Sequence, residues 1–135
     1  YLENFKGCKM SIPNNLKYTK EHEWVLVEGN IGTIGVTDYA QGELGDVVFV
    51  DIDPALSDVK KGASIGTIEA VKTVSDIYAP FSGKVVEINE ALKDSPEVVN
   101  SDPYGNGWML KVEISDPSEL SDLLDASAYQ ALIGQ

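Results

Sequence analysis

The feature that most constrains the fold of this sequence is an internal repeat. An Ile-Gly-Thr-Ile motif occurs at 31–34 and again at 65–68, and a Gly-x-Val-Val motif occurs at 45–48 and again at 83–86. The two motifs recur in the same order, which makes a chance match a poor explanation. The chain therefore contains two related halves, and we expect such halves to pair about a pseudo-twofold axis.

Both halves consist mostly of short β-type runs that are separated by turn signals. Glycine and proline mark the turns, and Val and Ile are frequent in the runs between them. Seven short strands at this spacing predict a mainly β fold, a flattened β-barrel or sandwich. The glycines at 32, 66 and 83 are expected at bulges or turns. The expected strands are 24–27, 31–36, 45–52, 65–71, 76–79, 84–88 and 108–114, with short helical turns at 38–44 and after 95–97.

The C-terminal region carries the clearest helical signals. Asp116 has the position of an N-cap, Pro117 follows as the first helical residue, and Glu119 is the carboxylate three residues after the cap. Asp125 is expected to cap a second helix. Both helices are expected to cover one edge of the β unit. The apolar residues on their inner faces would be Leu120, Leu123, Leu124, Tyr129, Leu132 and Ile133.

The length of 135 residues corresponds to a single domain. Residues 1–9 share no pattern with the rest, so we expect them to be an expression leader, with native numbering beginning at Met10. We expect residues 10–135 to form one domain. Its β unit would span about 16–114 and its C-terminal helical segment about 116–133.

Composition disfavours several classes of function. The chain has 22 acidic residues against ten lysines and no arginine, so its net charge is −12. Such a surface repels phosphate backbones and anionic lipid headgroups, so we expect neither nucleic acid nor a membrane as a partner. One cysteine, Cys8, and one histidine, His22, provide neither an intrachain disulfide nor a zinc site. We expect His22 to be packed or exposed and not to act as a general base.

The second half of the repeat is longer than the first between its two motifs. Residues 69–82 separate the two motifs in the second half, whereas the shorter segment 35–44 separates them in the first half. The chain must reverse direction between Ile68 and Ile77, and Lys72 lies near the middle of that reversal. Most lysines are solvated surface charges. A lysine at the tip of the one hairpin that the duplication lengthened is nevertheless a functional candidate.

The segment 69–80, with Ser82 and Gly83 after it, resembles the lipoylation hairpin of the glycine cleavage H-protein family. The resemblance covers about 16–133, and the order of its matching segments makes it specific. It implies a lipoyl-domain-like β-barrel with added terminal elements, and lipoate bound as an amide to the side-chain nitrogen of Lys72. The other matching segments are 22–24, 34–38, 40–41, 44–50, 94–96, 102–105 and 107–108.

The resemblance implies a shuttle protein without catalytic activity of its own. In the family, the lipoyl group takes an aminomethyl group from a pyridoxal-phosphate glycine decarboxylase to a tetrahydrofolate-dependent aminomethyltransferase, and dihydrolipoyl dehydrogenase reoxidises it. These three enzymes and the lipoylating enzymes would be the partners of a monomeric carrier. Its location would be the bacterial cytoplasm, or the mitochondrial matrix in a eukaryote. Because the residues offer no redox or one-carbon chemistry, a cofactor must supply it.

The same resemblance implies the roles of further site residues. Glu23 matches a cleft glutamate that would hold the ammonium of the loaded arm. Asp76 and Ser75 lie close to Lys72 and would support it, and Glu69 would help the lipoylating enzymes to recognise the hairpin. Without those roles, Glu23 and Asp76 would be solvated carboxylates, and Glu69 would be a cross-strand charge partner.

The sequence leaves two other functions open. The first is a different swinging-arm domain, either lipoylated for 2-oxo acid dehydrogenases or biotinylated for carboxylases. Biotinyl hairpins usually flank their lysine with methionine, whereas the neighbours here are Val71 and Thr73. The second is an unmodified β-sandwich interaction module, which no specific residue pattern favours. Within the resembled family, passing lipoate on to other enzymes is a further open role.

Overall fold

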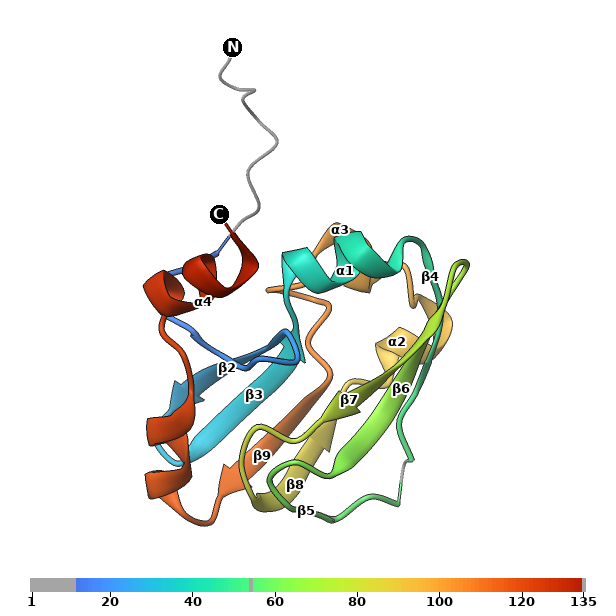
Figure 1. The fold of residues 1–135 in the computed structure, drawn as a ribbon. Helices are drawn as coiled ribbons and strands as arrows, with labels where there is room; N and C mark the ends of the chain where they lie inside the picture. The colour runs from blue at the N-terminus through green and yellow to red at the C-terminus, as the bar shows by residue number, and fades with distance from the viewer. Residues whose placement is uncertain (1–11, 54, 135) are drawn as a thin grey trace.

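Two antiparallel sheets make up the architecture of this chain in a computed structural model that describes residues 12–53 and 55–134 (Figure 1). The larger sheet has the strand order β1-β2-β3-β9-β8-β5, and the smaller has the order β4-β6-β7. Every strand pairing is antiparallel. The strands are β1 (Lys17–Tyr18), β2 (Glu23–Glu28), β3 (Ile31–Val36), β4 (Val47–Asp51), β5 (Asp58–Val59), β6 (Ser64–Ala70), β7 (Val74–Tyr78), β8 (Gly83–Ile88) and β9 (Leu110–Ile114).

The repeated motifs lie on strands in both sheets. The Ile-Gly-Thr-Ile motif lies on β3, an interior strand of the larger sheet, and on β6, the central strand of the smaller one. The Gly-x-Val-Val motif leads into β4 and β8. All seven expected strands and the mainly β class are confirmed, while the pseudo-twofold axis stays a prediction. The two-residue strands β1 and β5 were not predicted, because two residues are too few to show a period.

The main core lies between the two sheets and consists of alternate residues from facing strands. Its members include Val25, Ile34, Ile68, Ile77 and Phe81, each 1% exposed or less. A second, smaller cluster lies between the larger sheet and the C-terminal helix, where it includes Tyr18, Trp24 and Tyr129. The larger sheet therefore uses one face for each core, and the smaller sheet leaves its outer face to solvent.

Short helices connect and cover the sheets. The hydroxyl of Thr37 caps α1 by accepting from the amide of Ala40, and Gly45 ends that helix at φ +82°. The helix expected at 38–44 is therefore confirmed. The helical elements are α1 (Asp38–Leu44), α2 (Ala91–Asp94), α3 (Val98–Ser101), the 3-10 helix η2 (Pro117–Asp122) and α4 (Ala126–Ile133). No helix in the described ranges is long and apolar enough to cross a lipid bilayer.

The C-terminal segment differs in part from its expectation. Asp116 and Asp125 cap their helices as expected, but η2 is a 3-10 helix that ends before Leu123. Leu124 instead forms a β-bridge with Tyr18. The Glu119 carboxylate does not close a capping box, because it accepts from the amide of Ser82 at 2.7 Å and from its hydroxyl at 3.1 Å. Tertiary partners thus override the local helical pattern.

Two further expectations on single residues need correction. Leu132 of α4 is 47% exposed, because Tyr129 and Ala126 already fill the contact with the sheet. Gly32 lies in a regularly paired strand and not at a bulge. A β-carbon there would lie 2.5 Å from the Phe81 ring, so the close packing of that ring requires glycine. Gly66, by contrast, adjoins a register shift as expected. The expected leader, residues 1–9, lies outside the described residues.

Candidate functional site

Lys72 lies at the exposed tip of the hairpin between β6 and β7 (Figure 1). The last cross-strand pair is Glu69 with Val74, and the amide of Ala70 then donates to the carbonyl of Thr73 at 2.8 Å. The predicted reversal is therefore confirmed, although the turn uses neither glycine nor asparagine. A lysine at such a tip is accessible to an enzyme from several directions.

The hairpin tip rests on the loop between α1 and β4. The amide of Val71 donates to the carbonyl of Asp46 at 3.0 Å. The methylene stem of Lys72 passes over Gly45. A β-carbon added to this glycine would lie only 3.4 Å from Cε of Lys72. Asn100 holds this loop from behind: its amide donates to the carbonyl of Gly45 at 2.9 Å, and its oxygen accepts from the amide of Val47 at 2.8 Å. The root of the lysine side chain thus has a fixed support.

A cavity of about 120 Å³ lies next to this support and is lined by several separate parts of the chain. The start of β2 contributes Glu23, helix α1 contributes Leu44, and strand β7 contributes Asp76. We call this cavity the acidic cleft. Its full lining is Glu21, His22, Glu23, Val36, Ala40, Glu43, Leu44, Ile68, Ser75, Asp76 and Ile77. Four carboxylates in so small a cavity favour a cationic guest.

Glu23 is the buried acid of the cleft, with 1% of its surface exposed. One carboxylate oxygen accepts from the hydroxyl of Thr19 at 2.6 Å, and the other accepts from the backbone amide of Tyr78 at 3.2 Å. Burial raises the pKa of Glu23 to about 7, and these two hydrogen bonds oppose that rise. Near neutral pH the group is therefore divided between its acid and its carboxylate form, and a bound cation would favour the carboxylate.

The other predicted site residues occupy different places. Asp76 and Ser75 line the cleft, although both side chains are exposed. Asp76 accepts a hydrogen bond of 3.4 Å from the hydroxyl of Tyr78, and its negative charge raises the pKa of that tyrosine. Glu69 lies outside the cleft, on the outer face of the smaller sheet. Its cross-strand neighbours are the apolar Phe49 and Val74, so it has no charge partner at these positions.

Sequence reasoning missed several residues of the cleft. Glu21 and Glu43 add carboxylates to its lining, and Thr19 supplies the hydroxyl that bonds to Glu23. Glu21 immediately precedes His22, but Glu43 comes from helix α1. No local pattern joins these segments, because only the packing of α1 against the start of β2 brings them together.

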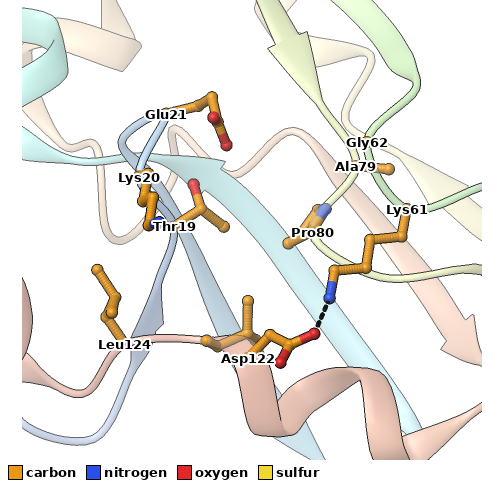
Figure 2. A pocket seen from close by; sticks show the side chains of 10 residues that line it. Thr19, Lys20, Glu21, Lys61, Gly62, Ala79, Pro80, Asp122 and Leu124 are labelled. Carbon is orange, nitrogen blue, oxygen red and sulfur yellow. Dashed lines mark hydrogen bonds and ion pairs between the residues drawn. The ribbon is translucent and has the colours of Figure 1, made fainter.

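A second cavity, of about 370 Å³, lies between the β1–β2 turn and η2 (Figure 2). Lys61 and Asp122 form an ion pair across one side of it, as Figure 2 shows. Glu21 lines both cavities, but no residue of 69–77 lines this one. Although it is the larger of the two, it lacks contact with the Lys72 hairpin, and we therefore place the functional site in the smaller acidic cleft.

The described residues contain no group of three or more His, Cys, Asp and Glu side chains with metal-binding geometry. The site instead pairs an accessible amine with a nearby cavity whose floor carries a buried acid. Such an arrangement fits a long flexible group that is attached to Lys72 and folds back toward Glu23. Glu23 would then meet a positive charge at the far end of that group.

Comparisons with known proteins point to one family. A sequence model described as glycine cleavage H-protein matches residues 16–135. The glycine cleavage system H protein of Staphylococcus haemolyticus (strain JCSC1435) is 59% identical over 126 residues, which are 93% of this chain and 100% of that protein. The crystal structure of a glycine cleavage system H protein from Mycobacterium marinum is 38% identical and has a TM-score of 0.84, over 92% of this chain and 100% of that one.

Proposed function

This chain belongs to the glycine cleavage H-protein family, and from that premise we propose that Lys72 is the lysine that carries its lipoyl group. A member of this family is a carrier component of the glycine cleavage system and is not itself catalytic. Its lipoyl-lysine shuttles the aminomethyl group from glycine decarboxylase to the aminomethyltransferase, and dihydrolipoyl dehydrogenase reoxidises the dithiol. The cofactor supplies the sulfur chemistry, and the protein supplies its position.

The observation that carries the Lys72 assignment is its place at the exposed hairpin tip, with its stem along Gly45. Attachment through an amide removes the lysine charge and leaves a long, largely apolar tether. While the carrier is docked on a partner, a tether on a fixed support keeps the reactive end at an effective concentration on the order of millimolar at the partner's site. The acidic cleft lies beside this support, so a folded-back arm has a cavity within the same surface.

We assign the acidic cleft to the loaded arm. An aminomethyl group on sulfur is a cation and is prone to hydrolysis, so a buried carboxylate that excludes water would prolong its life. Glu23 has the required burial, while Asp76 and Ser75 would contact the group closer to the cleft mouth. Cation binding would shift Glu23 fully to its carboxylate form.

The remaining assignments concern the molecule as a whole. Glu69, on the open face beside the tip, would serve recognition by the lipoylating enzymes. Residues 10–135 would form one carrier domain, which the family match over 16–135 supports. We propose that the carrier acts as a monomer and that its location is the bacterial cytoplasm; the bacterial source of the Staphylococcus haemolyticus relative supports the second of these proposals.

Replacing the proposed attachment residue tests the function. Lys72→Arg should fold as the wild type does but should remain unmodified, because a guanidinium does not form the amide. The measurement is the intact mass of each protein after incubation with a lipoyl ligase, ATP and lipoate. Glycine-dependent exchange of labelled bicarbonate with the decarboxylase should then fall to background.

A matched control is Lys84→Arg, which makes the same exchange at another exposed lysine, on β8. It should gain the lipoyl mass and support exchange at the wild-type rate. A Lys72→Arg protein that still acquires one lipoyl group would overturn the assignment and move the attachment to another lysine.

A further inference from the structure

The side chain of Tyr129, in helix α4, joins the two walls of the acidic cleft from behind. It is completely buried, and its ring stacks on Tyr18 with centroids 4.7 Å apart. Its hydroxyl lies 2.7 Å from the hydroxyl of Thr37 and 2.9 Å from Nδ1 of His22. These partners are 92 and 107 positions away in the sequence. The C-terminal helix thereby contacts both segments that form the cleft.

Thr37 and His22 each belong to a segment that forms one wall of the acidic cleft. Thr37 is the N-cap of α1, and its hydroxyl accepts from the amide of Ala40 at 3.1 Å. Helix α1 then places Ala40, Glu43 and Leu44 along the cleft. His22 immediately precedes Glu23 and itself lines the cleft. A direct bond from the amide of Thr37 to the carbonyl of His22, 3.0 Å long, completes the connection between the walls.

His22 also has an unusual backbone conformation. Its φ is +71°, and no other non-glycine residue in the described ranges has a positive φ. Such a conformation is strained for a residue with a β-carbon and persists only where the surroundings enforce it. Here it turns the chain so that the amide of His22 donates to the carbonyl of Thr19, and Glu23 then directs its carboxylate at the Thr19 hydroxyl. The Tyr129 contact with the imidazole opposes relaxation of this turn.

The hydrogen-bonding groups are mutually satisfied in either neutral tautomer of His22. A neutral imidazole with its proton on Nε2 accepts from the Tyr129 hydroxyl at Nδ1. The Tyr129 oxygen then accepts from the Thr37 hydroxyl. Burial lowers the pKa of His22, which keeps the imidazole neutral near pH 7. With the proton on Nδ1 instead, the donors and acceptors reverse along the chain, so either neutral tautomer keeps His22, Tyr129 and Thr37 connected.

We propose that Tyr129 is a positioning residue of the acidic cleft, whose hydroxyl holds His22, and through it Glu23, in the geometry that protects the loaded arm. This inference rests on the assignment of the cleft to the loaded arm. It gives the C-terminal helix a role in carrier function in addition to its role in the smaller core. Tyr129 does not line the cleft, and it acts through the conformation of the β1–β2 turn.

The test compares Tyr129→Phe with Tyr18→Phe, each of which removes one hydroxyl from a completely buried tyrosine. The Tyr18 hydroxyl donates to the carbonyl of Pro13, outside the cleft, so this variant is the matched control. In the unmodified protein, the NMR resonance of the Tyr78 amide, which donates to Glu23, should move in Tyr129→Phe and stay in place in Tyr18→Phe.

The second measurement uses lipoylated protein that has been loaded with glycine and glycine decarboxylase and then isolated. Hydrolysis of the aminomethyl thioether consumes one water, breaks the carbon–sulfur and carbon–nitrogen bonds, and releases ammonia and formaldehyde while it returns the free thiol on the arm. Ammonia therefore reports the life of the loaded arm. Tyr129→Phe should shorten this life about threefold to tenfold, the effect of one misplaced hydrogen bond. In a Glu23→Gln background it should have no further effect, because the two residues act along one path.

Wild-type lifetimes in Tyr129→Phe together with a shortened lifetime in Glu23→Gln would overturn this inference and leave the cleft assignment standing. Equal shortening by Tyr129→Phe in both backgrounds would also overturn it. A wild-type lifetime in Glu23→Gln would instead refute the cleft assignment itself. Should Tyr129→Phe fold poorly, His22→Ala removes the same bond from the other side, and an unchanged lifetime there would refute the proposal.

Discussion

At the scale of the single residue, Glu23 carries the chemistry that this chain itself contributes. Its carboxyl group is 1% exposed, and its two named partners, the Thr19 hydroxyl and the Tyr78 amide, are neutral donors. Two such donors offset the desolvation cost of a buried negative charge only in part. The cost that is left over raises the pKa of Glu23. The ionised residue therefore costs the protein stability, and a cation that entered the cleft would give it a partner.

The pH dependence of stability should show this cost. The folded pKa of Glu23, about 7, lies above the ordinary value of 4.5, so between these values the folded state binds more protons than the unfolded state. The free energy of unfolding is therefore highest below pH 4.5, where Glu23 is protonated. It falls as the pH rises through 7, where the buried group ionises. Glu23→Gln lacks this loss, so it should be more stable than the wild type at pH 8 by up to about 3 kcal/mol.

Urea unfolding of the unmodified proteins at pH 4.5 and pH 8 measures this effect. The difference between variant and wild type should be small at pH 4.5 and large at pH 8. Glu28→Gln, which neutralises an exposed glutamate at the end of β2, is the control and should show no such change. If Glu23→Gln and the wild type lost stability equally between these two pH values, Glu23 would not be a buried acid of raised pKa.

At the scale of the element, the end of helix α1 and the Lys72 hairpin meet at Gly45. Gly45 ends the helix with φ +82° and ψ −157°, a region that is essentially restricted to glycine. The stem of Lys72 lies directly over it, and the next residue, Asp46, accepts from the amide of Val71. One glycine therefore both stops the helix and supports the arm.

Two glycine-to-alanine substitutions, three positions apart, should have opposite effects. Gly45→Ala should destabilise the fold by about 1–3 kcal/mol, because alanine rarely adopts this backbone conformation. Gly42→Ala lies on an exposed position inside α1 and should stabilise the fold by up to about 1 kcal/mol, through helix propensity. Thermal and urea unfolding measure both. Equal effects of the two substitutions would contradict the strained-cap interpretation.

At the scale of the whole molecule, the charge is large, and acidic and apolar side chains share the sheet face beside Lys72. The net charge is −12. On the smaller sheet, one cross-strand row consists of Asp51, Thr67 and Asp76. Two residues nearer the tip, another row consists of Phe49, Glu69 and Val74. This open face therefore combines acidic groups with exposed apolar side chains beside Lys72. Amide formation on Lys72 would make it more acidic still.

We expect the partner enzymes to present basic patches to this acidic face, so association should weaken with salt. For dihydrolipoyl dehydrogenase acting on the reduced, lipoylated chain, kcat/KM should fall as ionic strength rises while kcat changes little, since screening slows the encounter. Free dihydrolipoamide is uncharged and serves as the control substrate, whose kcat/KM should not depend on salt. Asp51→Asn should weaken the salt dependence more than Glu28→Gln, whose turn lies far from the hairpin tip (Figure 1). A salt-independent kcat/KM would exclude steering by charge.

Local patterns were sufficient for the strands, the caps and the hairpin. Alternating and β-branched runs marked all seven longer strands, and Asp116 and Asp125 marked the two C-terminal caps. The length difference between the repeated halves located the reversal at Lys72. Each of these features depends on residues that are neighbours in sequence, where the spacing itself carries the structural information.

The sequence by itself therefore determined the mainly β architecture, the capped helices and the accessible lysine at the hairpin tip. The resemblance to the family had assigned Glu23, Ser75 and Asp76 to the site, and only the tertiary structure placed Glu21 and Glu43 in the same cavity. Glu23, Glu43 and Asp76 share a cavity because β2, α1 and β7 pack together. Likewise, the Tyr129 hydroxyl finds its two partners across 92 and 107 positions. Burial and hydrogen bonding between such distant segments depend on how the sheets and helices pack, and a one-dimensional period does not record that packing.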